Sequence, residues 1–261
     1  MEKVSSGMGK NSITSSYQVS DLTAQEISTG TVLPDFNGES YLSEIFNFRK
    51  TSTVSFVSVP LEFRINRIIK RLIDVFIATA FIAGILSWLA LIIAILIKAD
   101  SKGPVFFLQK RNKKNSKIFT CIKFRSMIVN TEADLVQAKE DDNRITRFGK
   151  FLRKYHLDEL PQFINVLFGD MSVIGPRPHM ISDNLKYQEL ISHYSCRCAV
   201  KPGITGLAQV SGYDGPVTDI EKMKIRVQMD NFYIRHWSLK LDMMILFKTG
   251  LKTIRLNGFP Q

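Results

Sequence analysis

Residues 75–97 carry no charged side chain over 23 consecutive positions. About 20 apolar residues in a helix are enough to cross the hydrocarbon core of a bilayer, so this run has the length of a membrane helix. Only Thr79, Gly84 and Ser87 interrupt its apolar character, and the run has no polar face. A core helix of a soluble domain usually keeps a polar face, so we expect residues 75–97 to lie in a membrane.

Basic residues flank the apolar run on both sides. Four Lys or Arg residues lie within 64–71 and seven lie within 98–117, where Asp100 is the only acid. Cytoplasmic flanks are enriched in Lys and Arg, which would put both ends of the run on that side. A helix that breaks near Gly84 and Ser87 and returns through the same face satisfies both flanks, if the freed backbone groups are bonded within the protein. A simple span is the alternative that the residues leave open.

The charge of the chain is unevenly distributed. There are 35 Lys and Arg against 24 Asp and Glu, a formal net charge of +11, yet residues 1–60 hold 4 of the bases and 6 of the acids. The basic excess of residues 61–261 predicts an anionic partner: phospholipid headgroups, a phosphorylated substrate or nucleic acid. Residues 1–60 also hold 18 Ser and Thr without a sustained hydrophobic period, which predicts a mobile extension.

These patterns divide the chain into an extension (1–60), a membrane-associated helical segment (61–102) and a polar domain (103–261). In the polar domain, residues 105–109 and 118–124 are expected strands around a polar turn, which predicts a hairpin. The polar residues 130–141 favour a helix. We therefore predict an α+β fold that is dominated by helices and contains one small β-hairpin.

Two segments of the polar domain are basic and amphipathic. In residues 145–155, Ile145, Phe148 and Leu152 share one face, and four bases lie largely on the other. Such a helix fits a membrane surface, and it fits equally a position on the protein's own core with its charges in solvent. Residues 239–256 have a similar character, and Trp237 just before them suits a membrane interface, where tryptophan is enriched.

Two adjacent carboxylates stand at the start of another predicted helix, over residues 159–168. Asp158 can be its N-cap and Glu159 suits its first turn, so a purely structural role explains both side chains. The functional alternative is a nucleophile beside a metal ligand. Carboxylates form covalent phosphoryl-enzyme intermediates, and Mg²⁺ is usually held by one or two carboxylates together with substrate phosphates.

Further bases are candidates for binding phosphate. Lys123 and Arg125 alternate at the end of the second strand and share one face, either as a phosphate clamp or as a solvated strand face. Arg177 lies between two prolines in the segment GPRP. Because proline fixes the backbone on either side, this segment either holds the guanidinium in place or simply forms a turn.

Several motifs of other protein classes are missing from the sequence. There is no glycine-rich nucleotide fingerprint, no Walker loop, no serine elbow and no recognised nucleic-acid motif. The three cysteines, Cys121, Cys196 and Cys198, are an odd number without the spacing of a zinc site or a disulfide framework. They indicate a reduced, cytoplasmic setting.

Several ordered segments together resemble the bacterial sugar transferase family, the monotopic polyprenyl-phosphate hexose-1-phosphate transferases. They lie between about Arg67 and Thr253 and read KRLIDVFIATAF, CIKFRSM, RKYHLDELPQFINVLFGDMSVIGPRPHM, VKPGITGLAQVSG and YIRHWSLKLD. The segment GPRPHM and the tail EKMKIRVQMDNFYIRHWSLKLD look most like members that begin exopolysaccharide or capsule chains with glucose or galactose.

The resemblance implies an activity. A hexose-1-phosphate would pass from a UDP-sugar to undecaprenyl phosphate, giving undecaprenyl-diphospho-sugar and UMP through a covalent phosphosugar-aspartyl intermediate. The matching residues are Asp158 as nucleophile and Glu159 as ligand of Mg²⁺. Four bases match positions that line the family's phosphate- and nucleotide-binding region: Lys123, Arg125, Arg153 and Arg177.

The resemblance also implies a re-entrant helix in the bacterial inner (cytoplasmic) membrane, with the catalytic domain 103–261 on the cytoplasmic side. The family's helix commonly breaks at Ser-Pro, whereas this chain has Ser87-Trp88. The turn 211–215, near the expected sugar, lacks the family's Asn and Arg. A non-enzymatic, membrane-anchored basic docking protein is the alternative function, no nucleic acid is expected as a partner, and a homo-oligomer is left open.

Overall fold

The apolar run lies in one long bent helix in the computed structural model. A 3₁₀ turn, η1 (Pro60–Glu62), precedes α2 (Arg64–Phe81), which continues through the π-helical segment η2 (Ile82–Leu86) into α3 (Ser87–Asp100). The structure describes residues 59–130, 142–215 and 219–258. The extension predicted for 1–60 lies almost wholly outside them, as does nearly all of the helix predicted for 130–141.

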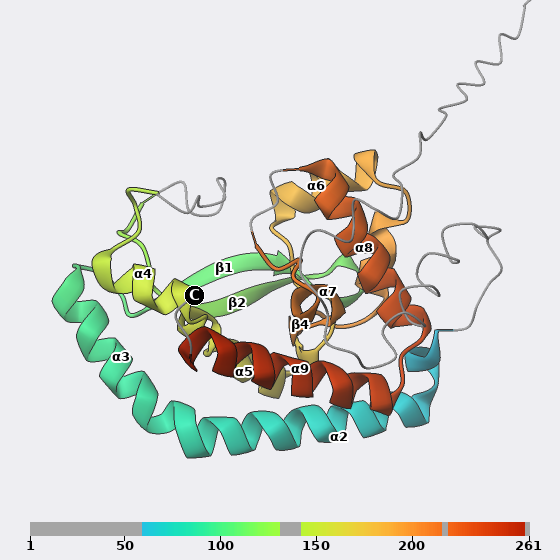
Figure 1. Ribbon diagram of the computed structural model, residues 1–261, viewed down its shortest axis with the longest axis horizontal. Helices are drawn as coiled ribbons and strands as arrows, with labels where there is room; N and C mark the ends of the chain where they lie inside the picture. Colours follow the sequence, from blue (N-terminus) through green and yellow to red (C-terminus); the bar gives the residue numbers. More distant parts are fainter. Residues whose placement is uncertain (1–58, 131–141, 216–218, 259–261) are drawn as a thin grey trace, which may run out of the picture. The chain divides into compact units, whose positions relative to one another are not determined.

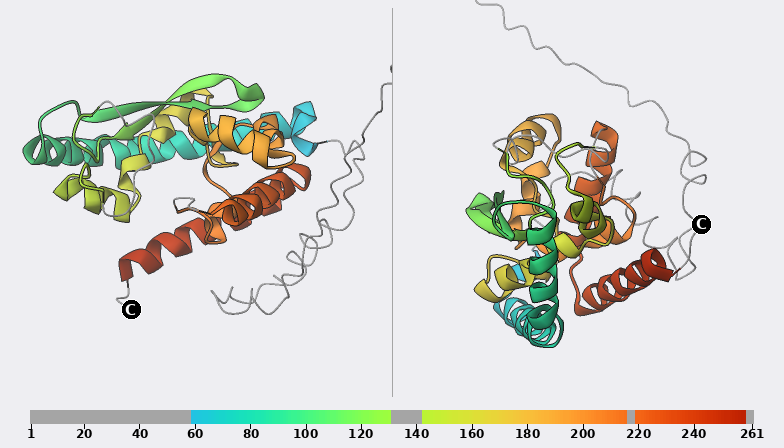
Figure 2. Two further views of the ribbon diagram at one scale, coloured as in Figure 1. Left: turned by 90° about the horizontal axis from the view of Figure 1, so that it is seen from above. Right: turned by 90° about the vertical axis from the view of Figure 1, so that its left-hand side faces the viewer.

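The helix bends at η2, where α3 turns away from the direction of α2 (Figure 1). The right-hand view of Figure 2 shows α3 from the side and α2 nearly end-on. Two side chains bond carbonyls of this segment: Ser87 Oγ donates to Ala83 O at 2.9 Å, and Trp88 Nε1 donates to Gly84 O at 2.9 Å. A π-segment shifts the hydrogen-bond ladder by one residue, which is one of the established causes of a helix kink. The Ser-Trp pair thus accompanies a bend in this chain without a proline.

Most of this helix is uncovered by the rest of the chain. It has the length and composition to cross a membrane, and only 17% of its most apolar 18-residue window is buried. Phe76, Leu91 and Ile95 are all more than 60% exposed. This exposure argues against a core helix, because a core helix removes such side chains from water.

The predicted hairpin is confirmed. Strand β1 (Phe106–Asn112) pairs antiparallel with β2 (Ile118–Phe124), with Leu108 opposite Ile122. The first strand begins one residue later and ends three residues later than predicted, so the connection shortens to the 3₁₀ turn η3 (Lys114–Ser116), where Asn115 takes a left-handed conformation.

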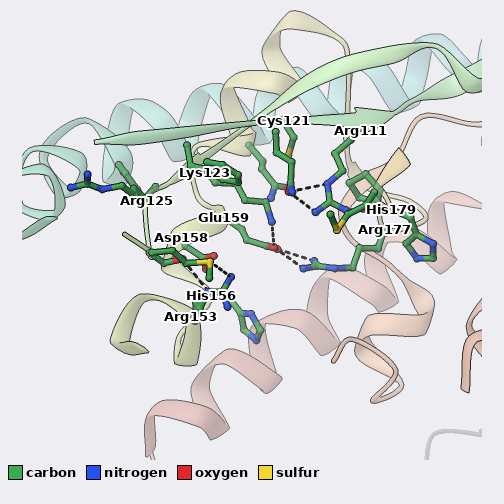
Figure 3. Close-up of a pocket in the computed structure, with 18 of the residues that line it drawn as sticks. Arg111, Cys121, Lys123, Arg125, Arg153, His156, Asp158, Glu159, Arg177 and His179 are labelled. Carbon is green, nitrogen blue, oxygen red and sulfur yellow. Dashed lines mark hydrogen bonds and ion pairs between the residues drawn. The ribbon is translucent and has the colours of Figure 1, made fainter. Parts of the chain in front are cut away.

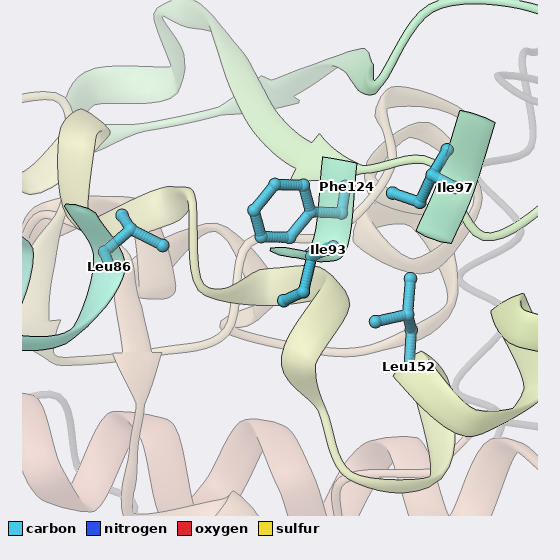
Figure 4. Packing of buried hydrophobic residues seen from close by; sticks show 5 residues of the cluster. All are labelled: Leu86, Ile93, Ile97, Phe124 and Leu152. Carbon is cyan, nitrogen blue, oxygen red and sulfur yellow. The ribbon is translucent and has the colours of Figure 1, made fainter. Parts of the chain in front are cut away.

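Helix α4 (Arg147–Lys154) is the predicted basic amphipathic helix, and its apolar face packs against the protein's own core. Thr146 caps it by accepting a hydrogen bond from Gly149 N, and Asp100 at the end of α3 accepts one from Phe148 N. Leu152 is fully buried and belongs to one hydrophobic cluster with Leu86, Ile93, Ile97 and Phe124 (Figure 4). Three of its bases remain exposed: Arg147, Lys150 and Lys154.

The predicted helix over 159–168 begins later than expected. A 3₁₀ turn, η4 (Leu157–Glu159), comes first, and α5 (Gln162–Phe168) follows with Pro161 before it. The prediction that Asp158 is the N-cap is therefore wrong, because Asp158 lies inside the preceding turn. The side chain of Asn165 joins α5 to the edge of β2: its Oδ1 accepts from Ile122 N at 2.9 Å and its Nδ2 donates to Thr120 O at 2.8 Å. This amide replaces the strand neighbour that β2 lacks on that side.

A second, parallel strand pair was not predicted from the sequence. Strand β3 (Ser172–Ile174) runs beside β4 (Gly203–Thr205), which belongs to the segment PGITG. A side chain at Gly175 would lie 2.7 Å from Lys201 O, and one at Gly203 would lie 2.1 Å from Gly175 N. These two glycines let the GPRP and PGITG backbones touch. Each strand has only three residues, which is too short to show a strand pattern in the sequence.

The remaining helices form the C-terminal part of the polar domain. They are α6 (Ile181–Leu190), η5 (Tyr194–Ala199), α7 (Leu207–Val210), α8 (Ile220–Arg235) and α9 (Leu239–Gly258). The interfacial position expected for Trp237 is wrong: its ring is buried, and Nε1 donates to Asp242 Oδ2 at 3.0 Å. A buried acceptor inside the first turn of α9 draws the indole inward.

Polar contacts attach α2 to this domain. Arg71 donates to the carbonyls of Val166 and Leu167 at the end of α5, at 2.6 and 2.8 Å. Buried Asp74 accepts from Ser172 Oγ and Val173 N, both at 2.9 Å. The bent helix and the polar domain are thus joined through their side chains, and Lys70 of α2 also pairs with Asp242 in the first turn of α9 at 2.7 Å.

Arg125 makes a similar attachment at the end of α3. Its guanidinium donates to Lys102 O at 2.6 Å, Ser101 O at 2.7 Å and Ile97 O at 3.5 Å. Gly103 leaves room for this contact, since a Cβ there would lie 1.9 Å from Arg125 Nη1. The guanidinium therefore caps the helix C-terminus, where a cation is favourable.

We expect Arg125→Gln to lower the free energy of unfolding by about 3 kcal/mol, because it removes charge-assisted hydrogen bonds to buried carbonyls. Thermal unfolding of the detergent-solubilised protein measures this loss. Lys117→Gln, which removes an exposed base from the same hairpin, serves as the matched control. Wild-type stability of Arg125→Gln together with weaker substrate binding would contradict the capping role.

Candidate active site

A cavity of about 420 Å³ lies where the hairpin, η4 and the GPRP segment meet. Small-molecule sites commonly have volumes of this order. All six site residues predicted from the sequence line it. Five of them lie together there: the two carboxylates and three of the four bases (Figure 3). These five are Lys123, Arg153, Asp158, Glu159 and Arg177.

The carboxylate pair lies in a tight turn between two helices. His156 takes a left-handed conformation (φ 54°) after α4 and begins η4. Its carbonyl accepts from Glu159 N at 3.3 Å, so the turn folds back on itself. Asp158 and Glu159 are both buried, at 7% and 8% exposure. Two buried neighbouring carboxylates are costly unless cations compensate them, and this already favours a functional role.

Glu159 is neutralised by two cations from distant segments. Arg177 donates to both of its oxygens, at 2.6 and 2.8 Å, and Lys123 Nζ lies 2.8 Å from Oε1. Burial alone raises the pKa of Glu159, but the charges of Arg177 and Lys123 outweigh burial and hold this pKa well below its usual range. Glu159 is therefore a permanent carboxylate at neutral pH.

Asp158 has a different environment from its neighbour. Among the described residues, none donates a hydrogen bond to its carboxylate or pairs with it. Burial, and then the charge of Glu159, raises the pKa of Asp158, while Lys123, Arg153 and Arg177 act in the opposite direction. The result is a carboxylate without a partner, close to cations, and such a group retains the basicity that a nucleophile needs.

Arg153 lies beside Asp158 at the edge of the cavity (Figure 3). Its Nε donates to Ser126 Oγ at 3.0 Å, and Nη2 lies 3.7 Å from Met127 Sδ. The residue comes from the last turn of α4, one turn before the carboxylates. Arg125 lines the cavity as well, but its guanidinium points away to the end of α3, so the structure does not bring it to the pair. Its proposed contact with phosphate stays a prediction that this geometry does not support.

Arg177 is held from behind by the polar domain. Arg197 Nη2 donates to Arg177 O at 2.7 Å, and Arg197 Nε pairs with buried Asp230 at 2.7 Å. Gly175 N donates to Thr205 O at 2.9 Å, which ties the GPRP segment to β4. The segment is therefore a rigid support for one guanidinium, as its two prolines suggested.

Sequence reasoning missed several polar residues of the cavity. Arg111 bonds Gln109 and the carbonyl of Pro178, and Arg226 donates to Gly215 O at 2.8 Å. Burial, and then the charge of Arg177, lowers the pKa of Arg226 to about 10. Asp214, in the turn 211–215, also lines the cavity. No local pattern distinguishes these residues, because each reaches the cavity only through the tertiary fold.

The carboxylate pair can hold one divalent cation only with help from a ligand. Among the described residues there is no group of three His, Cys, Asp or Glu side chains that could hold a metal ion. A carboxylate offers about four lone-pair positions, and Lys123 and Arg177 use three of those on Glu159. One position on Glu159 and the whole of Asp158 remain, which fits Mg²⁺, since that ion needs few carboxylates when phosphates supply other oxygens.

Known proteins are similar to this chain in sequence. The chain is 46% identical over 223 residues to the UDP-glucose:undecaprenyl-phosphate glucose-1-phosphate transferase of Klebsiella pneumoniae, covering 81% of this chain and 48% of that one. It is 45% identical over 192 residues to the UDP-N-acetylgalactosamine-undecaprenyl-phosphate N-acetylgalactosaminephosphotransferase of Aeromonas hydrophila, covering 73% and 44%.

A third relative matches nearly end to end. The exopolysaccharide production protein PSS of Rhizobium leguminosarum bv. phaseoli is 42% identical over 198 residues, which cover 74% of this chain and 98% of that protein. The chain spans about half the length of the Klebsiella and Escherichia coli glucose-1-phosphate transferases that it matches. The model of the bacterial sugar transferase family matches residues 65–256, which include the bent helix, the hairpin, the carboxylate pair and the GPRP segment. The chain belongs to the bacterial sugar transferase family.

Proposed function

We propose that this chain transfers a hexose-1-phosphate from a UDP-sugar to undecaprenyl phosphate, as a phosphoglycosyl transferase. One observation supports this above the others: buried Asp158 has no partner among the described residues and lies next to a carboxylate that two cations neutralise. An enzyme that attacks a polyanion with a carboxylate needs such an arrangement, since repulsion would otherwise raise the barrier.

In the proposed first step, a carboxylate oxygen of Asp158 attacks the β-phosphorus of the UDP-sugar. A new O–P bond forms, the bond from that phosphorus to the bridging oxygen breaks, and UMP leaves with the electron pair. Lys123, Arg153 and Arg177 are the bases around the pair, and they would stabilise the charge on the phosphoryl oxygens.

In the proposed second step, an oxygen of the lipid phosphate attacks the phosphorus of the phosphosugar-aspartyl intermediate. The aspartyl O–P bond breaks, which regenerates the Asp158 carboxylate and releases undecaprenyl-diphospho-sugar. No net proton transfer is required, because both nucleophiles are anions. The single unpartnered carboxylate can therefore serve as nucleophile and then as leaving group.

We propose that Glu159, together with substrate phosphates, holds Mg²⁺. When bound, the ion would neutralise charge on the transferred phosphoryl group. Lys123 and Arg177 keep Glu159 ionised and fix its orientation, so that the remaining lone pair has a constant direction. Asp158 stays free for the chemistry.

We propose further that the bent helix is re-entrant in the bacterial inner membrane, with residues 103–261 in the cytoplasm. The bend at η2, the bases at both ends of the apolar run and its exposure support this topology. We assign glucose or galactose as the sugar, and exopolysaccharide or capsule synthesis as the destination of the product. Relatives named for glucose and for N-acetylgalactosamine show that the family accommodates several sugars.

Nucleotide release tests the activity. With undecaprenyl phosphate, Mg²⁺ and a panel of UDP-sugars, we expect UMP from one sugar, and Asp158→Asn should lower turnover by at least about 10³-fold because it removes the nucleophile. Asp170→Asn, at an acid paired with Lys113 outside the cavity, is the matched control and should retain turnover. A chelator should stop the reaction.

Three results of this assay would contradict the proposal. Release of UDP would indicate a conventional glycosyltransferase. If Asp158→Asn kept the wild-type turnover, Asp158 would not be the nucleophile. No nucleotide from any donor, with a folded and lipid-supplied protein, would leave the membrane-anchored docking protein as the better interpretation.

The raised pKa of Asp158 predicts a pH dependence. The nucleophile must be ionised, so turnover should fall as the pH decreases through this pKa, which lies above the usual value of about 3.9 for aspartate. Arg153→Gln removes a charge that lowers this pKa. The fall in turnover on the acid side of the pH profile should therefore occur at higher pH in this variant. The pH profile of kcat/KM measures the shift, and Lys150→Gln on the same helix should leave the acid side of the profile unmoved. If Arg153→Gln left the acid side of the profile unchanged, a group other than Asp158 would control the pH dependence.

Labelling of introduced cysteines tests the topology. In inverted and right-side-out membrane vesicles, Arg64→Cys and Lys102→Cys should both react only from the cytoplasmic face, because a re-entrant helix returns both ends to one side. Replacing Cys196 and Cys198 with serine first removes the accessible native thiols. Reaction of the two positions from opposite faces would instead establish a span.

A further inference from the structure

A second cavity lies along the first half of α2. It has a volume of about 480 Å³ and shares no lining residue with the cavity around the carboxylate pair. Its walls between the charged groups are apolar and include Leu61, Ile68 and Ile174. The proposed transfer reaction makes no use of this cavity.

Six bases line this second cavity, and the protein itself neutralises or bonds only two of them. Lys70 pairs with Asp242 at 2.7 Å, and Arg71 donates to two carbonyls of α5. Asp74, the one acid that lines the cavity within the described part of the chain, accepts hydrogen bonds from Ser172 and Val173. The side chains of the other four bases make no hydrogen bond or ion pair with a described residue: Arg64, Arg67, Lys114 and Lys201.

Lys201, one of these four bases, forms no ion pair with a described acid. Its side chain is half-buried, and burial, and then the charge of Arg71, lowers its pKa. A Cβ on Gly169 would lie 3.4 Å from Lys201 Nζ and 3.7 Å from Arg71 Nη2, so the two cations flank the same point. Like charges brought together at the edge of an apolar cavity are destabilising unless an anion joins them.

The surface beside the cavity indicates where that anion comes from. Ile65, Ile68, Leu72 and Phe76 are spaced along one side of α2 and are between 45% and 75% exposed. Apolar side chains alternate here with Arg64 and Arg67, a pattern typical of a helix at the level of lipid headgroups. A cavity with cations at its rim and apolar walls matches a phosphate that carries an acyl chain better than it matches free phosphate.

We infer that this cavity binds the headgroup phosphate of an anionic phospholipid, with Arg64, Arg67, Lys114 and Lys201 around the phosphate and an acyl chain against the apolar wall. Basic pockets of this kind beside membrane helices bind anionic lipid headgroups. The bound lipid would fix α2 at the membrane surface. This inference does not depend on the transferase reaction, since it concerns a separate cavity.

Native mass spectrometry of the full chain in detergent tests this inference. The probes are dioleoylphosphatidylglycerol, dioleoylphosphatidylcholine and inorganic phosphate. We expect one tightly bound phosphatidylglycerol, with at least about tenfold preference over phosphatidylcholine, and at least about tenfold weaker binding in Arg64→Gln/Arg67→Gln/Lys201→Gln. Lys201→Gln alone should also weaken the binding of phosphatidylglycerol. This single variant replaces the triple variant in the test if the triple variant does not fold.

The matched control removes three exposed bases from α4: Arg147→Gln/Lys150→Gln/Lys154→Gln. It should bind phosphatidylglycerol like the wild type, whereas an equal loss would reveal a non-specific charge effect and overturn the inference. Equal binding of both phospholipids would overturn it too, as would phosphate binding as tight as that of phosphatidylglycerol. Displacement of phosphatidylglycerol by undecaprenyl phosphate would assign the cavity to the acceptor instead. In detergent without phosphatidylglycerol, and with undecaprenyl phosphate as the acceptor, the Lys201→Gln variant should release UMP at the wild-type rate, which separates this inference from the proposed function.

Discussion

The ion pairs of Glu159 join three segments that are far apart in the sequence. Lys123 comes from the hairpin, Arg177 from the GPRP segment after β3, and Glu159 from the turn between α4 and α5. A buried carboxylate without these partners would strongly destabilise the folded domain, so the contact between the three segments contributes to its stability. The same contacts define the floor of the cavity, and stability and function therefore depend on the same residues.

This network gives two adjacent carboxylates different properties. The cations contact Glu159 directly and keep it ionised, whereas they act on Asp158 only through space. Asp158 therefore lies in a positive field without losing its lone pairs to a hydrogen bond. Pairs of acids whose environments differ in this way commonly divide a reaction between a reacting group and a supporting group.

The bent helix is connected to the site through protein contacts as well as through its own apolar surface. Asp74 binds the backbone of β3, and β3 leads directly into GPRP. Arg125 binds the end of α3 and directly follows β2, which carries Lys123. In the proposed topology, the depth of the helix in the bilayer would therefore set the depth of the cavity relative to the acceptor phosphate of the proposed reaction.

The sequence by itself determined the apolar helix, the hairpin, the amphipathic character of α4 and the motifs that carry Asp158, Glu159 and Arg177, because each depends on local period or on adjacent residues. Only the tertiary structure decided that Asp158 is no helix cap, that Trp237 is buried and that Arg125 caps α3 instead of facing the carboxylates. It also brought Arg111, Arg226 and Asp214 to the cavity and paired β3 with β4. These outcomes depend on which distant acceptor a buried polar group reaches, and no local pattern records that distance.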